Sequence, residues 1–592
     1  MNNVLQWTHY TVTTGLYITR EIITILLNGS IDNQKWYVYG KKADFNSLGA
    51  KYGISPVIAR IMINRGIPED GFDLFLNGTL NDIHDGRLMN DMELAADIIA
   101  GAIDEGKKIR VVGDYDIDGV CSTYILVSAL KKLGADVSYA IPDRIKDGYG
   151  INTAIIKEAQ FEGVDLIITC DNGISAHEAC ELAMQYGMNV VITDHHEVPE
   201  QLPGADAIVD PKQPGDPYPF TDICGAMVAF KLVKVLYENA GIPMEEWKRL
   251  LEFAAIATVG DVMPLRDENR IIVKEGLEKL KTTDNIGLNA LKDACLLPPG
   301  GINAYAIGFI LGPCINAGGR LETADIAMEL FMADDEKKAE ELADHLKELN
   351  DERKLLTEEY ADMAVRQVED RFPEDDVKVV YLPDCHESIA GIIAGRIKEY
   401  YNHPAIVFTN SGPGLIKGSA RSIEKYNMYE KLSEVSELFD KFGGHKLAAG
   451  ISMKLDNLDI LRERLNKESG LTEDDFVRKV WIDVPLPLEY ATVDLFEQLE
   501  RLEPFGQGNE KPVFAQKNVT VLSARTVLNY RNFVKFKLRD AAYFNADGIQ
   551  FGDSDEILSA LAKRDRIDIL YYPKLNLFNG RRSIDIQIKT WK

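Results

Sequence analysis

Acidic and imidazole side chains follow four apolar segments of this 592-residue chain. Three aspartates, Asp114, Asp116 and Asp118, come after the first segment, and the later segments end in three further aspartates and two histidines. These later residues are Asp171, Asp194, His195, His196 and Asp261. Carboxylates that gather in one place repel one another severely unless a cation lies between them. Oxygen and imidazole ligands suit Mn²⁺ or Mg²⁺ better than a thiolate-type zinc site, so the pattern predicts a centre for divalent metal ions.

The first three of these apolar segments are typical of buried strands, whereas Asp261 follows a further apolar run. From about residue 107, short apolar runs such as KIRVVG alternate with helical patterns such as VCSTYILVSALKKLG. This alternation predicts a mostly parallel sheet with helices on both faces. Ligands bind beyond the carboxyl ends of such strands, and residues two apart in an extended segment point the same way. Asp114, Asp116 and Asp118 can therefore converge, and Gly119 lets the chain turn sharply into the following helix.

The pattern changes after residue 322. Residues 323–371 contain no Pro or Gly and are rich in Ala, Glu, Lys, Leu and Asp, which predicts long helices. A second α/β pattern follows, and the last hundred or so residues combine short strands with Asn-Gly and Asp-Gly turns, which predicts a small barrel. We divide the chain into an N-terminal mixed segment, a first α/β lobe, connecting helices, a second α/β lobe and a barrel module. Their ranges are 1–80, 81–322, 323–372, 373–466 and 474–592.

The charge is distributed unevenly along the chain. The net charge of −27 argues against a nucleic-acid partner, but residues 511–592 contain 15 Lys and Arg against 8 Asp and Glu. This segment therefore carries +7 and the rest of the chain −34. A basic module on an acidic body can bind phosphates locally, or it can be a basic domain without a ligand. Aromatic and basic residues alternate from Tyr530 and Arg531 through Phe533, Lys535, Phe536 and Lys537. This alternation fits nucleobase stacking, and it equally fits a barrel with aromatic rings inside and charges outside.

The cysteines and the apolar content indicate a cytoplasmic protein. Seven scattered cysteines without a CxxC pair indicate reduced thiols and no structural zinc site. No run of eighteen apolar residues occurs, so we expect neither a membrane span nor a membrane partner. The apolar stretch from Val4 to Leu27 is interrupted by His9, Arg20 and Glu21 and lacks a basic start. We expect a structural strand and helix there, or a start codon assigned too early, rather than a signal peptide.

Two glycine-containing motifs in the second lobe are candidates for phosphate binding. GSARS, at 418–422, offers the hydroxyl of Ser419 and the guanidinium of Arg421, which can fork onto phosphate oxygens. GGHKLAAG, at 443–450, contains Gly444 and His445, and closely spaced glycines let backbone amides approach a phosphate. Taken alone, the second motif is more often a tight packing turn. Arg320, in NAGGR, is a similar candidate from the first lobe.

In this order, the motifs GDYDIDG, CDNG, TDHH and ATVGDVMPL resemble the DHH phosphoesterase superfamily. With IPDRIKDGYG, PKQPGD, NAGGRL, GSARS and GGHKLAAG, they are similar to the RecJ exonuclease family in particular. The similarity runs from about Trp36 to the C-terminus. It implies a DHH domain and a DHH-associated domain, both α/β, joined by a long helix and followed by an oligonucleotide-binding (OB) fold.

The resemblance also implies roles for single residues. The implied metal ligands are Asp116, Asp118, Asp171, His195 and Asp261. His196 would contact the scissile phosphate, Asp194 would orient one of the histidines, and Asp114 would be a ligand or an orienting group. Arg320, Ser419 and Arg421 would contact the terminal phosphate or the backbone of a strand. One departure concerns Val112, because many superfamily members carry a histidine there; either one metal is held more weakly or Asp114 compensates.

The activity that the resemblance implies is two-metal hydrolysis of single-stranded DNA from 5′ to 3′, giving mononucleotides, in DNA repair and recombination. Single-strand-binding protein and a helicase are the implied protein partners. One alternative is a phosphodiesterase for short oligonucleotides or cyclic dinucleotides, but such small substrates do not need the basic module. Another is a non-catalytic scaffold in replication, but such proteins lose the acidic ligands that this chain keeps.

Overall fold

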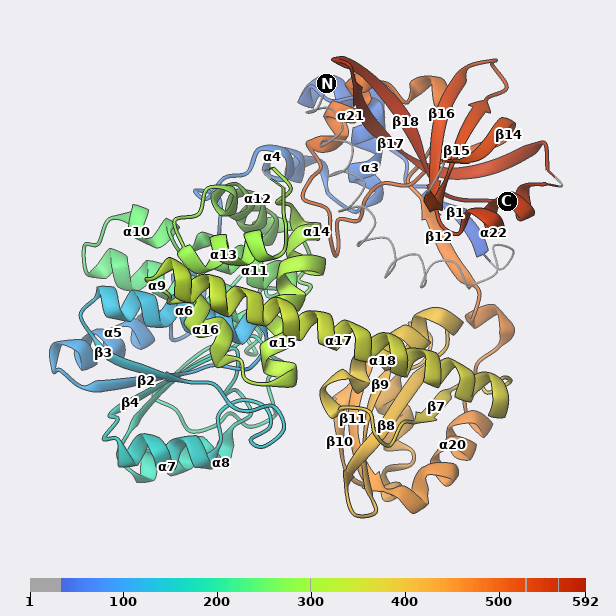
Figure 1. The fold of residues 1–592 in the computed structure, drawn as a ribbon. Coiled ribbons are helices and arrows are strands. Elements are labelled where there is room, and N and C mark those ends of the chain that lie inside the picture. Colours follow the sequence, from blue (N-terminus) through green and yellow to red (C-terminus); the bar gives the residue numbers. More distant parts are fainter. Residues whose placement is uncertain (1–33, 299, 528–529, 563) are drawn as a thin grey trace. The chain divides into compact units, whose positions relative to one another are not determined.

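The structure is a computed structural model that describes residues 34–298, 300–527, 530–562 and 564–592 (Figure 1). The stretch from Val4 to Leu27 lies outside the described residues, and so do the side chains of Tyr530 and Arg531. No helix of the described residues is long and apolar enough to cross a membrane. Two compact units emerge. Unit 1 combines the described residues up to Phe72 with Thr357–Leu502 and Pro512–Lys592, and unit 2 combines Asp73–Leu356 with Glu503–Lys511.

Unit 2 is built on a five-stranded parallel sheet with strand order β3-β2-β4-β5-β6. The strands are β2 (Lys108–Val112), β3 (Asp136–Ala140), β4 (Leu166–Cys170), β5 (Asn189–Thr193) and β6 (Ala207–Val209). Every residue of β4 is buried, because helices cover both faces of the sheet. Leu166 and Ile168 join one apolar core and Ile167 joins another, as the two-residue period of a strand requires. The first lobe is therefore the α/β domain that the sequence predicts.

The helices of unit 2 divide between these two cores. The first core contains α6 (Ile117–Lys132), α9 (Gly225–Asn239), α11 (Leu251–Gly260) and α12 (Asp267–Lys281). The second contains α7 (Thr153–Phe161) and α8 (His177–Gln185), on the opposite side of the sheet (Figure 1). The unit's other helical elements include α5 (Met92–Asp104), α10 (Met244–Lys248), α13 (Ile286–Ala294), α14 (Ala304–Ala306), a π-helix (Ile307–Leu311), α15 (Gly312–Leu321) and α16 (Asp325–Phe331).

A single helix, α17 (Glu336–Arg371), runs from unit 2 into unit 1. It corresponds to the long helical pattern in the sequence. The second lobe begins after it, with a five-stranded sheet of order β10-β11-β9-β8-β7 in which only β7 and β8 are parallel. Its elements are β7 (Lys378–Tyr381), α18 (Glu387–Tyr401), β8 (Ala405–Gly412), β9 (Leu415–Arg421), α19 (Met428–Ser433), β10 (Phe439–His445), β11 (Ala448–Lys454) and α20 (Leu458–Lys467).

The C-terminal module is a small barrel, as the sequence predicts. Its strand order is β13-β14-β15-β16-β18-β17, and an additional pairing of β14 with β17 closes it. The strands are β13 (Val484–Pro485), β14 (Phe514–Val527), β15 (Tyr530–Arg539), β16 (Asn545–Phe551), β17 (Arg566–Phe578) and β18 (Arg581–Trp591), with helices α21 (Val493–Glu500) and α22 (Ser554–Leu561). The predicted combination of two α/β lobes, a long helix and a C-terminal barrel is confirmed.

The described N-terminal residues belong to the same unit as the barrel. Strand β1 (Gln34–Val38) pairs in parallel with β12 (Arg478–Ile482), and helices α2 (Phe45–Tyr52) and α3 (Pro56–Asn64) follow it. The Asn64 amide donates to the Asp483 carbonyl at 3.0 Å, next to the first barrel strand. The chain therefore closes unit 1 by bringing together segments that lie more than 400 residues apart.

We predict opposite stability effects for alanine at two helical glycines of unit 2. In α12, a Cβ on Gly276 would lie 2.3 Å from the Cβ of Ala255 in α11, whereas a Cβ on Gly101 in α5 would meet no described atom within 4 Å. Gly276→Ala should lower the free energy of unfolding by about 1–3 kcal/mol through overpacking. Gly101→Ala should raise it by about 0.5–1 kcal/mol, because alanine restricts the unfolded chain and favours the helix. Urea unfolding of the full chain measures both, and changes of the same sign would contradict this packing.

Candidate active site

The predicted acidic residues lie together: most stand beyond the carboxyl ends of β2, β4 and β5, and Asp261 is the C-cap of helix α11. After β2 the chain folds back tightly onto the first turn of α6, since a Cβ on Gly119 would lie 2.4 Å from the carbonyl oxygen of Asp114. Asp116 is the N-cap of α6, and its carboxylate accepts from the backbone N–H groups of Asp118 and Gly119 at 3.0 and 3.1 Å. Such side-chain capping is the reason why an aspartate begins the helix here.

Asp118 is held by the backbone of a second helix. Its two carboxylate oxygens accept from Gly225 N at 2.7 Å and Ala226 N at 2.8 Å, at the start of α9. Unsatisfied N–H groups and the positive end of the helix dipole both favour a carboxylate in this position. Both oxygens of the buried Asp118 carboxylate therefore have backbone donors, and one of them lies 3.5 Å from His195 Nε2.

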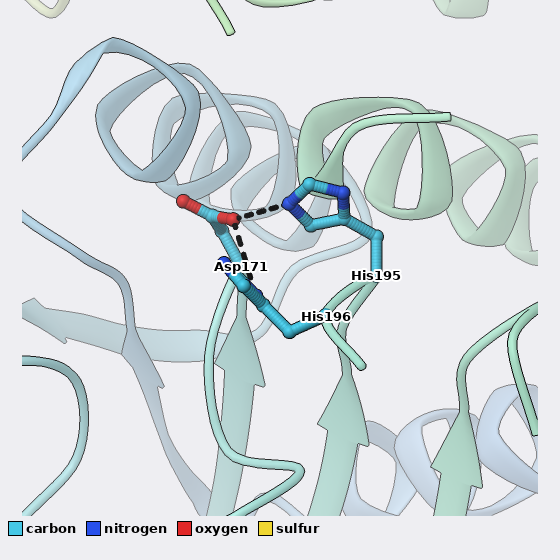
Figure 2. A group of neighbouring side chains, drawn as sticks. All are labelled: Asp171, His195 and His196. Atoms are coloured by element: carbon cyan, nitrogen blue, oxygen red, sulfur yellow. Dashed lines mark hydrogen bonds and ion pairs between the residues drawn. The ribbon is translucent and has the colours of Figure 1, made fainter. Parts of the chain in front are cut away.

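Asp171 follows β4 in a left-handed conformation, with φ of 61°. The close approach of α9 fixes it there, since a Cβ on Gly225 would lie 2.6 Å from the Cβ of Asp171. Figure 2 shows the Asp171 carboxylate directed at the two histidines, 3.0 Å from His195 Nε2 and 4.0 Å from His196 Nδ1. Burial, followed by the negative charges of Asp118 and Asp116, raises the pKa of Asp171 far above its usual value.

Asp194 is buried behind the histidines and orients this corner of the site. Its carboxylate accepts from Ile174 N at 2.9 Å, from His195 N at 2.8 Å and from His196 Nδ1 at 2.7 Å. Burial opposes ionisation of Asp194, but the His196 contact and the backbone donors lower its pKa. Burial also lowers the pKa of His196, and the hydrogen bond to Asp194 outweighs this and raises it to about 9. The hydrogen bond to Asp194 therefore fixes the half-exposed His196 ring and favours its protonated form.

The remaining atoms of the cluster fit divalent metal ions. Within the described part of the chain, His195 Nδ1 and Asp261 Oδ2 are buried without a hydrogen-bond partner. Burial raises the pKa of Asp114 and of Asp261 to about 8, and neighbouring carboxylates add to the effect. The candidate ligand atoms form three sets, and within each set the atoms lie within 4.8 Å of one another. A divalent cation would remove the repulsion between the carboxylates. These sets are Asp171–His195–His196, Asp118–His195–Asp261 and Asp114–Asp116–Asp171. All the predicted ligands thus lie in one cluster.

Three residues that support the cluster were not predicted. Asn316, on α15, accepts from Ile117 N at 2.9 Å and so holds the loop between Asp116 and Asp118. The Tyr149 hydroxyl donates to the Asp171 carbonyl at 2.7 Å and lies 3.2 Å from both ring nitrogens of His196. Asn172 accepts from Ile151 N at 3.0 Å. All three stand inside the quoted motifs NAGGRL, IPDRIKDGYG and CDNG, and this was the only sequence signal for them.

Val112, the position at which many superfamily members carry a histidine, belongs to the apolar core. It is the last residue of β2, is fully buried and packs in the cluster that contains Ile167 and Ile192. Asp114, two residues later, contributes to one of the three sets of candidate ligand atoms.

In the second lobe, Ser419, Arg421 and His445 share one face of the sheet in unit 1, whereas Gly444 pairs with Ala449 on the apolar face. Ser419 lies opposite Gly450 and Arg421 opposite Ala448, and these pair in turn with Gly443 and His445. Directly opposed residues of antiparallel strands point to the same face. This face carries small and polar residues, and the other face carries the apolar core with Ile416, Ala420 and Ile451.

The GGHKLAAG motif forms the β10–β11 hairpin. Gly444 has φ of 147°, and a Cβ there would lie 2.4 Å from the carbonyl oxygen of Ala448, so the motif is a tight packing turn. His445 is exposed beside it, whereas Arg421 is partly buried and donates to its neighbour's carbonyl, Ala420 O, at 2.8 Å. Arg320, in the last turn of α15, belongs to unit 2. Burial raises the pKa of Tyr115, next to the acidic loop, and the positive charge of Arg320 partly offsets this rise.

The structure of strand β15 shows where its alternating basic and aromatic side chains lie. Phe536 is 2% exposed and packs inside the barrel with Val534 and Leu538, so it offers no stacking surface. Lys535 and Lys537 point outward and are exposed. Phe533 alternates with these buried residues and lies partly exposed on the outward side, with its ring 6.1 Å from that of Phe551. The aromatic-in, charge-out interpretation therefore holds for Phe536 and the two lysines but not for Phe533, and the outward lysines supply positive charge on the surface of the barrel.

Models of three protein families match the chain. They are the DHH family N-terminal domain over residues 108–258, the DHHA1 domain over residues 374–469 and the RecJ OB domain over residues 482–590. The first covers β2 and the strand exits up to α11, the second covers the sheet with Ser419 and Arg421, and the third covers the barrel.

Full-length relatives and solved structures agree with these matches. The single-stranded-DNA-specific exonuclease RecJ of Bacillus subtilis is 37% identical over 561 residues, which cover 94% of this chain and 70% of that protein. The crystal structure of RecJ from Thermus thermophilus in complex with Mn²⁺ has a TM-score of 0.82 at 29% identity and covers 95% of this chain and 80% of its own. The same protein in complex with Mg²⁺ has a TM-score of 0.76 at 27% identity, with 95% and 79% covered.

We predict that Asn316 sets the metal affinity of the cluster. Asn316→Ala leaves the buried Ile117 N–H without an acceptor, which should cost about 1–3 kcal/mol of stability and weaken Mn²⁺ binding. Asn289→Ala is the matched control, because Asn289 also makes a partly buried hydrogen bond, to the Thr283 carbonyl at 2.9 Å, away from the acidic loop. Thermal unfolding in EDTA and at rising Mn²⁺ measures both effects. If Mn²⁺ stabilises Asn316→Ala as much as wild type, the loop contact does not govern metal binding.

Proposed function

The chain belongs to the RecJ exonuclease family, and from this we propose that it is a single-stranded-DNA-specific exonuclease that hydrolyses phosphodiester bonds with divalent metal ions. The observation that carries the proposal is the buried carboxylate–imidazole cluster, in which His195 Nε2 faces carboxylate oxygens of Asp118, Asp171 and Asp261 at 3.5, 3.0 and 3.8 Å. Asp261 Oδ2 has no hydrogen-bond partner among the described residues. Degradation from 5′ to 3′ and release of mononucleotides, in DNA repair and recombination, follow from the family resemblance.

The side chains of the cluster have different roles in the reaction. Mn²⁺ or Mg²⁺, when bound, supplies Lewis-acid chemistry at the phosphate and lowers the pKa of water. The residues that would hold it are Asp116, Asp118, Asp171, His195 and Asp261, with Asp114 beside them as a further ligand or an orienting group. Asp194 fixes the His196 ring through the 2.7 Å hydrogen bond to Nδ1. The other ring nitrogen, Nε2, lies 3.2 Å from the Tyr149 hydroxyl and is the atom that contacts an oxygen of the scissile phosphate.

Strand binding belongs to other surfaces. The residues that contact the terminal phosphate or the strand backbone are Arg320 in unit 2 and Ser419, Arg421, Gly444 and His445 in the second-lobe sheet. Helix α18 lies next to Ser419 and Arg421, since a Cβ on Gly391 would lie 3.0 Å from the Arg421 guanidinium. The barrel adds outward lysines to a segment with net charge +7, which supports binding of a longer single strand rather than a short oligonucleotide or a cyclic dinucleotide.

The setting of the reaction follows from the same resemblance. We infer that single-strand-binding protein and a helicase act together with this enzyme, since degradation of one strand requires that strand to be exposed. The seven unpaired cysteines support a reducing compartment, the cytoplasm.

Substitutions should separate chemistry from strand binding. Asp116→Ala and Asp171→Ala should abolish cleavage and leave DNA binding largely intact, because each removes a ligand without emptying a core. Arg421→Ala should do the reverse. Loss of one charge-assisted hydrogen bond is worth about 1.5–3 kcal/mol, so affinity for a 5′-phosphorylated strand should fall by about one to two powers of ten.

The measurements are cleavage at saturating substrate with Mn²⁺ and dissociation constants in Ca²⁺ for all three variants, each of which serves as a control for the others. Cleavage by Asp171→Ala near the wild-type rate would place the active site elsewhere. Normal binding by Arg421→Ala would remove the second lobe from strand binding and leave the hydrolase assignment standing.

The barrel should contribute through charge. If Lys535 contacts one phosphate, Lys535→Ala should reduce the slope of log affinity against log salt by about 0.7 for single strands. Lys467→Ala, at the exposed end of α20, changes the net charge equally and is the matched control. Fluorescence anisotropy with a labelled single strand in Ca²⁺ gives both slopes. Equal slopes for the two variants would show that this face of the barrel does not touch the strand.

A further inference from the structure

Two cysteines of unit 2 face each other outside the acidic cluster. Cys295 is the C-cap of α13, Cys314 lies in the first turn of α15, and their sulfur atoms are 3.6 Å apart. All seven cysteines belong to the described residues, and only these two have sulfur atoms within hydrogen-bonding distance of each other. Because a disulfide bond is about 2.05 Å long, a further approach of the two sulfur atoms by roughly 1.6 Å would join them.

The two thiols differ in their access to solvent and in the charges around them. Cys295 is partly exposed, whereas Cys314 is 1% exposed and accepts from the Asn350 amide, on α17, at 3.3 Å. The hydrogen bond from Cys295 lowers the pKa of the Cys314 thiol, burial opposes this effect, and the positive charges of Lys347 and Lys354 add to it. A small oxidant can therefore reach Cys295, and Cys314 is the better nucleophile beside it.

The segment that separates the two cysteines packs against the acidic loop. Near its end, a Cβ on Gly312 would lie 3.2 Å from Cδ1 of Ile117, which stands inside that loop. Asn316, two residues after Cys314, accepts from Ile117 N at 2.9 Å. A covalent bond at Cys314 would thus anchor the start of α15, the helix that supports the acidic loop.

We propose that Cys295 and Cys314 form a redox-sensitive pair, which hydrogen peroxide converts into a disulfide that ties α13 to α15. The Cys295 sulfur attacks one oxygen of the peroxide, the O–O bond breaks, and the thiol proton leaves with the other oxygen as water. Cys314 then attacks the resulting sulfenic-acid sulfur as a thiolate. The S–O bond breaks, the S–S bond forms, and the hydroxyl leaves as water with the proton that Cys314 released. Two thiols thereby lose two electrons, which reduce one peroxide to two waters.

The disulfide should stabilise unit 2 under oxidising conditions. Disulfides of cytosolic proteins are usually transient and redox-sensing, and a bond that closes residues 295–314 into a loop restricts the unfolded chain. The folded state therefore gains stability while the oxidant is present, and a thiol reductant reverses the gain. The proposal depends on the geometry of the two sulfur atoms and goes beyond the proposed function.

Mass spectrometry of the full chain tests the pairing. Residues 293–320 form one tryptic peptide that contains both cysteines and no other. After treatment with hydrogen peroxide in EDTA and labelling with N-ethylmaleimide, this peptide should have lost two hydrogens and carry no label, and dithiothreitol should restore both thiols. Cys180→Ala is the matched control and should form the disulfide as wild type does, because Cys180 is buried in the other apolar core of unit 2. Labelling of both cysteines in the treated wild type, or a sulfinic acid in place of the disulfide, would overturn the proposal.

Two further comparisons test the effect of charge and of the bond. Lys347→Ala should slow disulfide formation by about twofold to tenfold, because fewer Cys314 thiols are ionised. Lys337→Ala is its control, since both lysines lie on α17 and pair with an acidic residue four positions later. Oxidation should raise the unfolding temperature of wild type and leave that of Cys295→Ala unchanged. Equal rates for the two lysine variants, or the same temperature shift in Cys295→Ala as in wild type, would each contradict the proposal. Because every sample contains EDTA, an absence of nuclease activity would not affect these tests.

Discussion

The mutual repulsion of buried carboxylates is the constraint on which the rest of unit 2 depends. Asp114, Asp118 and Asp171 are each at most 3% exposed, and Asp116 and Asp261 lie beside them. Like charges in a medium of low dielectric are costly, so the fold must either neutralise them or surround them with fixed donors. It does both. Carboxylate oxygens face the candidate site for divalent cations. Backbone N–H groups donate to the carboxylate oxygens that do not face this site.

The backbone N–H donors come from segments that lie far from the aspartates in the sequence. Asp118 depends on the start of α9, more than one hundred residues away, and Asp194 depends on Ile174 and on its own neighbours. A parallel sheet makes this possible because all its strands end at one edge, where the first turns of the following helices also lie. The same edge supplies the anions and the dipoles that hold them.

The strand exits and the residues that stand at them were predictable, because strand–helix alternation and Asp–His–His spacing are local patterns. The supports of the cluster were not, since Asn316 reaches Ile117 across 199 residues of sequence. The pairing of β1 with β12 is likewise invisible in a local pattern, because only the register of two distant strands defines it. Phe536 shows the limit of alternation on a strand: the same spacing suits a base-stacking face and a barrel interior, and the closure of β14 on β17 decides for the interior.

The left-handed backbone at Asp171 restricts how this scaffold can change over generations. Among L-residues, asparagine and aspartate tolerate that conformation best, and glycine adopts it freely. Codons for asparagine and glycine are each one nucleotide away from those for aspartate. The simplest exchanges at this position therefore preserve the turn after β4 and remove the carboxylate. A lineage that loses catalysis can pass through such a change with its fold intact, which makes a folded, inactive descendant easily accessible from this architecture.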